Sequence, residues 1–146
     1  MTTRLVVDAS VVLKWQLIDE ENTAQAVALR DDFIQTGGAE VLAPGLLLYE
    51  VANGVRMAVR RGRVSPSDAH DALTELWALG IRYLIPEPSR VLDLAFQFGL
   101  TAYDAAYLAL AQEQGCPLWT ADRSLFEASS SHLPWVRWLG DYPAEG

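Results

Sequence analysis

The chain has few of the side chains that bind soft metals or carry out nucleophilic catalysis. It contains one cysteine and two histidines in 146 residues. Cys116 has no cysteine or histidine at metal-ligand spacing, so an internal disulfide and a zinc site of cysteines and histidines are excluded. We expect Cys116 to be a small buried apolar residue in a reducing compartment. His70 and His132 show no partner pattern, which argues against a serine-histidine-aspartate triad.

Long apolar runs are also missing. No run approaches the ~18 residues that a membrane-spanning helix needs. The N-terminal segment MTTRLVVDAS lacks the basic, apolar and small-residue order of a signal peptide. We therefore expect a cytoplasmic protein. The length and a hydrophobic content of 51% favour one globular domain over residues 1–146, with a core at about 4–139 and a tail at 140–146.

Basic residues are outnumbered by acidic ones. Eleven lysines and arginines stand against 19 aspartates and glutamates, which gives a formal net charge of -8. This balance argues against broad, non-specific binding to nucleic acid, which requires a positive surface. The segment RMAVRRGR nevertheless concentrates four of the basic residues, and a local positive patch is expected there: Arg56, Arg60, Arg61 and Arg63.

Short apolar runs alternate with helical patterns along the chain. The predicted strands are 4–7, 40–43, 81–85, 117–121 and 135–139. The predicted helices are 22–36, 44–61, 65–80, 90–98, 101–114 and 122–128, with a short helix or turn at 10–17. Asn22 is expected to cap the first long helix, which would stop at 37–38, and Pro44 to open the second. Segments 129–132 and 141–146 look loose.

This alternation predicts the fold class. Strands separated by helical segments pair in parallel, because the chain must cross back over the sheet between them. We therefore predict an α/β fold of three layers. It would have a central, mostly parallel sheet of about four to five short strands with helices on both faces.

Two aspartates follow predicted strands. Asp8 comes directly after 4–7, and Asp122 comes directly after 117–121. Ligands of open parallel sheets bind at the carboxyl ends of the strands, so both positions favour a site. Each aspartate also has a structural explanation. Asp8 could form an Asx turn with the backbone of Ser10, and Asp122 could cap the helix that follows it.

Two further acids interrupt helix faces that are otherwise apolar. Glu50 lies in GLLLYEVANGV, and Asp104 lies in LTAYDAAYLALA. Asp104 stands three residues after Thr101 and fits a capping box. Glu50 is harder to explain, because a carboxylate on an apolar stripe needs a partner or a cation. Arg4 and Arg56 are the candidate ion-pair partners.

The four acids together favour a metal site. Two carboxylates about 4 Å apart repel by about 4 kcal/mol at an effective dielectric constant of about 20. A fold keeps such a cluster only if a cation sits within it. Ligands that are all oxygen suit Mg²⁺ or Mn²⁺, which often bind together with phosphate groups. The expected ligands of one or two ions are Asp8, Glu50, Asp104 and Asp122.

Other functions fit the same fold class. A phospho-accepting receiver module needs an acceptor aspartate after a central strand and a lysine late in the chain. Strand 81–85 ends without an aspartate, and the only lysine is Lys14. A phosphatase of the Asp-x-Asp type is disfavoured, because Asp8 has no second aspartate two residues later. A regulatory domain that keeps the fold and binds a partner without catalysis stays open.

Four motifs, taken in order, resemble the PIN-domain nucleases and in particular the VapC toxins of bacterial toxin-antitoxin pairs. They are VVDAS with Asp8 and Ser10, LYEVANGVR with Glu50 and Asn53, LTAYDAAYLALA with Asp104, and LWTADRSL with Asp122. The likeness runs over about residues 5–139. It implies a metal-dependent endoribonuclease that is inhibited by a cognate VapB-type antitoxin and commonly forms a homodimer.

The resemblance gives the four acids the catalytic and metal-binding roles. Mg²⁺, with Mn²⁺ as a substitute, would make hydroxide available near neutral pH, with a 5′-phosphate and a 3′-hydroxyl as the expected products. Ser10 would bind a metal water or phosphate, and Asn53 would orient Glu50. A helix cap for Ser10 and an exposed amide for Asn53 are equally good explanations. The four arginines would bind RNA phosphates or acidic antitoxin residues, or only stabilise a helix end.

Overall fold

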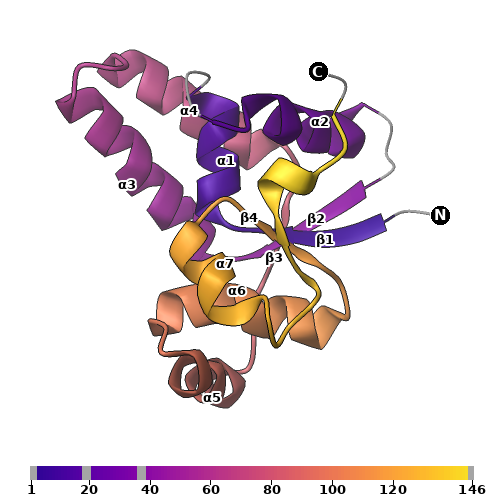
Figure 1. The fold of residues 1–146 in the computed structure, drawn as a ribbon. Coiled ribbons are helices and arrows are strands. Elements are labelled where there is room, and N and C mark those ends of the chain that lie inside the picture. Colours follow the sequence, from indigo (N-terminus) through magenta and orange to yellow (C-terminus); the bar gives the residue numbers. More distant parts are fainter. Residues whose placement is uncertain (1–2, 18–20, 36–38, 145–146) are drawn as a thin grey trace.

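The central sheet has five strands, all parallel, in the order β3-β2-β1-β4-β5 (Figure 1). The structure is a computed structural model that describes residues 3–17, 21–35 and 39–144. Its strands are β1 Thr3–Val7, β2 Ala39–Pro44, β3 Arg82–Leu84, β4 Leu118–Thr120 and β5 Val136–Trp138. The predicted α/β fold with a parallel sheet is confirmed.

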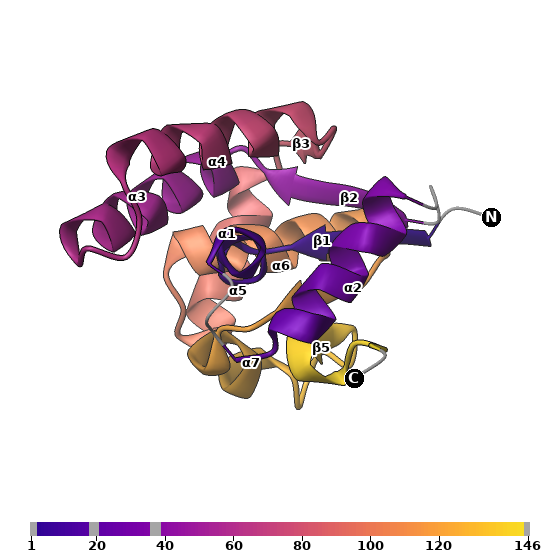
Figure 2. The same ribbon diagram turned by 90° about the horizontal axis from the view of Figure 1, so that it is seen from above.

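Helices cover both faces of this sheet. They are α1 Ala9–Gln16, α2 Thr23–Ile34, α3 Leu46–Arg60, α4 Pro66–Ala78, α5 Pro88–Phe98, α6 Ala102–Gln114 and α7 Arg123–Ser129, followed by a short 3₁₀ turn at Leu139–Asp141. Figure 1 shows α1, α2 and α4 above the sheet and α5 and α6 below it, and Figure 2 shows α1 and α2 from above. Among the helices in the described ranges, none is long and apolar enough to cross a membrane.

The core lies on both sides of β1, whose residues Leu5, Val6 and Val7 are buried. Helix α6 is buried over the continuous stretch 105–111. A helix that is apolar on every side is stable only between two other layers, and α6 lies between the sheet and α5. Its ends are set locally: the hydroxyl of Thr101 accepts from the Asp104 N–H, and Gly115 takes the left-handed conformation at φ 62°.

One predicted helix start was wrong, and a second was right in its position but not in its side-chain contact. Pro44 does not open α3. It is the last residue of β2, where it pairs with Leu84, and α3 begins at Leu46. A proline lacks the N–H that a further ladder bond would need, so it ends the strand instead. Asn22 does precede α2, but its φ of 61° is left-handed and its side chain makes no capping hydrogen bond. The predicted stop at 37–38 lies outside the described residues.

Each of the two segments that looked loose in the sequence contains one residue that packs against the rest of the protein. Ser129 is fully buried at the end of α7, and its hydroxyl donates to the Leu125 carbonyl at 2.7 Å. In the tail, the Tyr142 hydroxyl donates to Asp32 at 2.5 Å, and its ring meets that of Trp119 edge-on at 4.9 Å. Long-range contacts of aromatic residues hold this end of the chain, and local composition does not reveal them.

The strand order creates a switch point between β1 and β4. The chain leaves β1 toward β2 and β3, whereas it leaves β4 in the opposite direction toward β5. The connections at the carboxyl ends of these two neighbouring strands therefore diverge, which is the arrangement at which open parallel sheets bind ligands. Asp8 follows β1, and Thr120 is the last residue of β4. Both thus reach the place where parallel sheets bind ligands.

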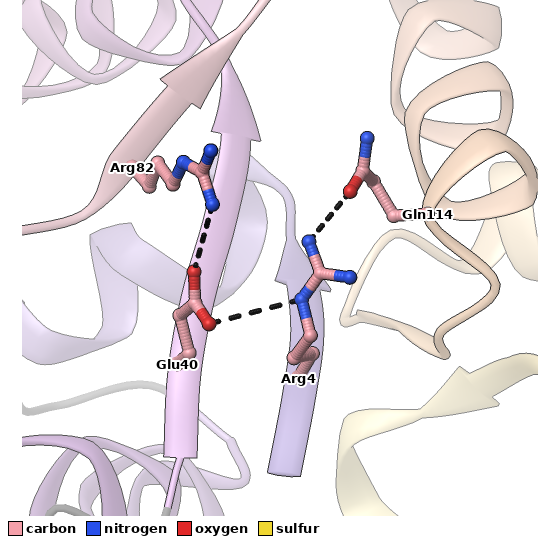
Figure 3. Close-up of polar contacts among 4 residues, drawn as sticks. All are labelled: Arg4, Glu40, Arg82 and Gln114. Carbon is pink, nitrogen blue, oxygen red and sulfur yellow. Dashed lines mark hydrogen bonds and ion pairs between the residues drawn. The ribbon is translucent and has the colours of Figure 1, made fainter. Parts of the chain in front are cut away.

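The amino ends of the strands carry a different set of polar residues (Figure 3). The register of β1 and β2 places Arg4 opposite Glu40, and their Nε and Oε2 atoms are 3.7 Å apart. Arg82 on β3 approaches the other oxygen of Glu40 at 3.4 Å. Arg4 also donates to Gln114 of α6 at 2.5 Å. These contacts join three strands and one helix at the edge away from the switch point.

Candidate active site

Asp8 lies at the switch point with 5% of its surface exposed. Its carboxylate accepts hydrogen bonds from the hydroxyls of Ser10 and Thr120 and, at 3.3 Å, from the Val11 N–H. The last of these bonds caps α1, so the structural role is real, although it is a helix cap and not the turn expected with the Ser10 backbone. The cap uses only part of the carboxylate's capacity to accept hydrogen bonds.

The charge on Asp8 is poorly compensated. Burial raises its pKa from 3.8 to about 6, against the opposing effect of three hydrogen bonds and with a further increase from Asp122. Burial outweighs the hydrogen bonds because all three donors are neutral groups. In this environment, a nearby cation would strongly stabilise the ionised form of the buried carboxylate.

Two hydroxyl groups connect the ends of β1 and β4. Thr120 is fully buried, donates to Asp8 and accepts from the Asp122 N–H at 3.0 Å. Ser10 donates to Asp8 and accepts from the Ala121 N–H at 2.9 Å. Thr120 had no role in the sequence-based assignment. Its position at the end of a buried strand, two residues before an acid, was the available signal.

Glu50 is held by a tyrosine. The Tyr107 hydroxyl donates to Glu50 Oε1 at 2.5 Å, and the tyrosine is 1% exposed. The predicted arginine partners were wrong: Arg4 pairs with Glu40, and Arg56 donates to the Asn53 amide oxygen at 3.3 Å. Tyr107 was also missed. It lies one helical turn after Asp104, which places both on the same face of α6.

The pKa values of Glu50, Asp104 and Tyr107 are all raised, and burial is the largest cause in each case. For Glu50, the Tyr107 hydrogen bond opposes this rise, and the charges of Asp104 and Asp122 add to it. For Asp104, the charge of Asp122 adds to the rise, and the hydrogen bond with Thr101 opposes it. The carboxylates of Glu50, Asp104 and Asp122 are thus close enough for their charges to influence one another.

Asp122 connects the group. Its charge raises the pKa of Asp8, Glu50 and Asp104. It also caps α7, accepting from the Leu125 N–H at 3.2 Å, so the helix-cap explanation holds here as well. Across residues 3–17, 21–35 and 39–144, none of these four acids forms an ion pair with arginine, lysine or histidine.

The donor chemistry of these acids fits a hard divalent cation. All four offer carboxylate oxygens, which Mg²⁺ prefers, and two are held by hydroxyl groups that orient the carboxylates without neutralising them. Within the described part of the chain, no three acidic, histidine or cysteine side chains are grouped closely enough to form a preformed metal site. The charges of the four acids influence one another, but in this part of the chain the side chains are not arranged as a preformed metal site.

The remaining predicted site residues lie around this group. Ser10 contacts Asp8, as described above. Asn53 is exposed on α3, and its amide oxygen accepts from Arg56, whereas Glu50 is held by Tyr107. The arginine cluster follows Glu50 along the protruding hairpin of α3 and α4 (Figure 1). At a rise of about 1.5 Å per residue, Arg56 lies about 9 Å and Arg60 about 15 Å along the helix from Glu50.

Comparison with known proteins gives a consistent result. The family model of the PIN domain matches residues 5–130. Ribonuclease VapC3 of Pyrobaculum aerophilum is 36% identical over 128 residues, which cover 85% of this chain and 93% of that protein. Ribonuclease VapC9 of Mycobacterium tuberculosis is 32% identical over 133 residues, which cover 89% of this chain and 94% of that protein.

Solved structures share the architecture. PAE2754 from Pyrobaculum aerophilum aligns with a TM-score of 0.71 and 26% identity over 95% of this chain and 92% of that one. VapC20 of Mycobacterium tuberculosis, a toxin that cleaves the sarcin-ricin loop, aligns with a TM-score of 0.61 over 86% of this chain and 95% of that one. Its 14% identity supports the fold alone. By its family match and its relatives, the chain belongs to the PIN-domain family, in its VapC-type branch.

Proposed function

We propose that this protein is a Mg²⁺-dependent endoribonuclease and the toxin of a toxin-antitoxin pair. The observation that carries the proposal is a group of four acids around the switch point whose charges influence one another and which, among the described residues, form no ion pair with a basic side chain. The names of the relatives, which are ribonucleases of the VapC type, support the same reaction class. RNA phosphodiester bonds would be cleaved by an activated water molecule, which leaves a 5′-phosphate and a 3′-hydroxyl.

The roles follow from the contacts. Asp8, Glu50, Asp104 and Asp122 would hold the ion, directly or through water. A bound Mg²⁺ supplies an acidified water and positive charge for the phosphate. Thr120 and Ser10 are positioning residues that fix both oxygens of Asp8, and Tyr107 fixes one oxygen of Glu50. Such hydroxyl groups orient a ligand without competing for the positive charge.

The arginine cluster would bind phosphates that flank the cleaved bond or acidic residues of the antitoxin. Arg56 lies nearest to Glu50 along α3, whereas Arg60, Arg61 and Arg63 lie at the tip of the hairpin. With this helix geometry, Arg56 is the one arginine of the cluster that can reach a phosphate next to the cleaved bond. The tip residues would contact more distant phosphates or the VapB-type antitoxin. We further propose that the protein acts as a homodimer in the cytoplasm.

Expression of the protein alone tests the proposed activity. Cells that produce the intact protein should accumulate RNA fragments with 5′-phosphate ends at defined sites, and cells that produce Asp8→Asn should not. Asparagine keeps the helix cap at this position, so loss of cleavage would reflect the lost charge. Equal cleavage by the folded Asp8→Asn variant would refute the assignment.

Metal binding separates the enzyme from a catalytically silent partner-binding domain of the same fold. Mg²⁺ or Mn²⁺ should raise the melting temperature of the purified protein, because an ion that binds only the folded state stabilises it. The Asp104→Asn variant should lose most of this shift. If the two proteins respond equally, the silent domain becomes the better explanation.

A further inference from the structure

A cavity of about 560 Å³ opens beside Glu50. Its walls come from α1, α3 and α6, which are far apart in the sequence. Tyr49 of α3 and Tyr103 of α6 both line it, and they are 79% and 68% exposed. Each tyrosine directly precedes a proposed catalytic acid, Glu50 or Asp104. The volume lies in the range of pockets that hold small organic ligands.

The chemistry of the walls favours a flat, neutral ligand. Apart from Glu50, the lining residues carry no charged side chain, so a phosphate group has no cationic partner among them. The two tyrosine rings line the cavity and can stack with a flat ligand, and Asn53 has an amide that can both donate and accept hydrogen bonds. Aromatic faces with one or two polar groups are the usual surroundings of an unstacked nucleobase.

The position of Glu50 selects RNA over a protein as the occupant. Glu50 belongs both to the acid group and to the cavity wall. Because Glu50 is shared, an RNA strand whose phosphate is held by the acids would place a neighbouring base beside this cavity. Arg56, which contacts Asn53 at the same wall, adds positive charge near the adjoining backbone.

We propose that this cavity binds an unpaired nucleobase next to the cleaved phosphodiester bond, stacked against Tyr49 and Tyr103. This inference rests on the proposed ribonuclease function and makes it more specific. The substrate must be single-stranded or an open loop at the cleaved position, because a paired base cannot leave its stack to enter the cavity. Tyr49, Tyr103 and Asn53 would then be determinants of specificity.

The test uses short single-stranded RNAs that carry the fluorescent base 2-aminopurine at one position in turn. They are titrated with Mg²⁺ into the Asp8→Asn protein, in which the RNA stays intact, and stacking is read as fluorescence quenching. Tyr49→Ala and Tyr103→Ala, added singly, should weaken binding about tenfold each and reduce the quenching. Tyr49→Phe and Tyr103→Phe keep the ring and should bind within about twofold of the parent.

Phe96→Ala serves as the matched control. Phe96 is 76% exposed on α5 and does not line this cavity, so its loss should leave binding and quenching unchanged. Unchanged binding by both tyrosine-to-alanine variants would overturn the proposal. Equal affinity for a fully paired hairpin would do the same. Alanine variants that keep RNA binding but no longer bind a co-expressed antitoxin would assign the cavity to the protein partner and overturn it as well.

Cleavage measured separately distinguishes the two proposals. If the protein with Asp8 intact cleaves RNA, but the tyrosine variants bind like the parent, only the base pocket fails. If quenching depends on the tyrosines, but no RNA is cleaved, the pocket stands and the nuclease function fails.

Discussion

Acidic side chains occupy both edges of the parallel sheet, but their partners differ. At the amino edge, Glu40 lies between Arg4 and Arg82 (Figure 3). At the carboxyl edge, the hydrogen bonds that Asp8 and Glu50 accept from the described residues come from hydroxyl or backbone N–H groups. An ion pair neutralises a carboxylate, which indicates a structural role for that side chain. Neutral donors fix a carboxylate in place and leave its charge for a cation.

The largest expected effect concerns catalysis at the carboxyl edge. Asp104→Asn should lower the rate of RNA cleavage about 1,000-fold, or by about 4 kcal/mol of transition-state stabilisation, because it removes one proposed ion ligand. Rates of the purified proteins on one RNA, with Mg²⁺ present, measure this effect.

Asp68→Asn is a close control for this change. Asp68 has the same position in α4 that Asp104 has in α6, and its N–H donates to the capping hydroxyl of Ser65 at 3.0 Å, compared with 3.1 Å to Thr101. The control loses the same charge near a helix start but should keep full activity. Similar losses in both variants would mean that helix capping, not the site, explains Asp104.

The next effect is a dependence of stability on pH. Asp8 has a folded-state pKa of about 6, above its ordinary value of 3.8. The folded state therefore binds the proton more tightly than the unfolded state does. The stabilisation that protonation of Asp8 contributes is fully present below pH 3.8 and is lost as the pH rises through 6. Without metal, the free energy of unfolding should increase by roughly 2.5 kcal/mol from pH 7.5 to pH 4 through this group.

Urea unfolding in EDTA at several pH values measures this dependence. Asp8→Asn removes the titrating group and should flatten that part of the profile. The raised pKa values of Glu50 and Asp104 act in the same direction, so part of the slope should remain. If the substitution leaves the whole profile unchanged, Asp8 does not carry the uncompensated charge described here.

A smaller effect is expected for the hydroxyl that holds Asp8. Thr120→Val keeps the shape of the buried side chain but removes its hydrogen bonds with Asp8 and with the Asp122 N–H. The protein should lose about 2 kcal/mol of stability at pH 7.5, because a buried charged acceptor and a backbone donor are left without this partner. Thr74→Val on the exposed face of α4 is the control. Equal urea midpoints for the two variants would argue against the positioning role.

The fold could be predicted because its signals are local. Apolar runs, helix caps and glycine stops follow one another along the chain, and the first predicted strand, 4–7, overlaps β1 Thr3–Val7 almost completely. The alternation of strands and helices then determines parallel pairing. The same reasoning predicted that Asp8 and Asp122 follow strands, because each depends only on where a strand ends.

The contacts that complete the site could not be predicted in this way. Tyr107 and Glu50 are 57 residues apart, and Thr120 and Asp8 are 112 apart. Nothing in a single sequence indicates which distant groups meet. The expectation that Arg4 or Arg56 could pair with Glu50 was wrong for the same reason. Arg4 faces Glu40 because of the register between β1 and β2, which depends on strand order and not on charge.

The smallest effect tests the other side of the comparison. Glu40→Gln removes both ion pairs at the amino edge, whose side chains are 37% to 60% exposed. Solvent screens exposed pairs, so the loss of stability should stay within about 1 kcal/mol at low ionic strength and almost disappear in about 0.5 M salt. RNA cleavage should be unchanged, because the residue lies away from the switch point. Urea midpoints at two salt concentrations, together with the cleavage rate, give the result. A large loss of activity would show that an acid paired with arginines can still serve the chemistry, and the type of partner would no longer distinguish the two edges.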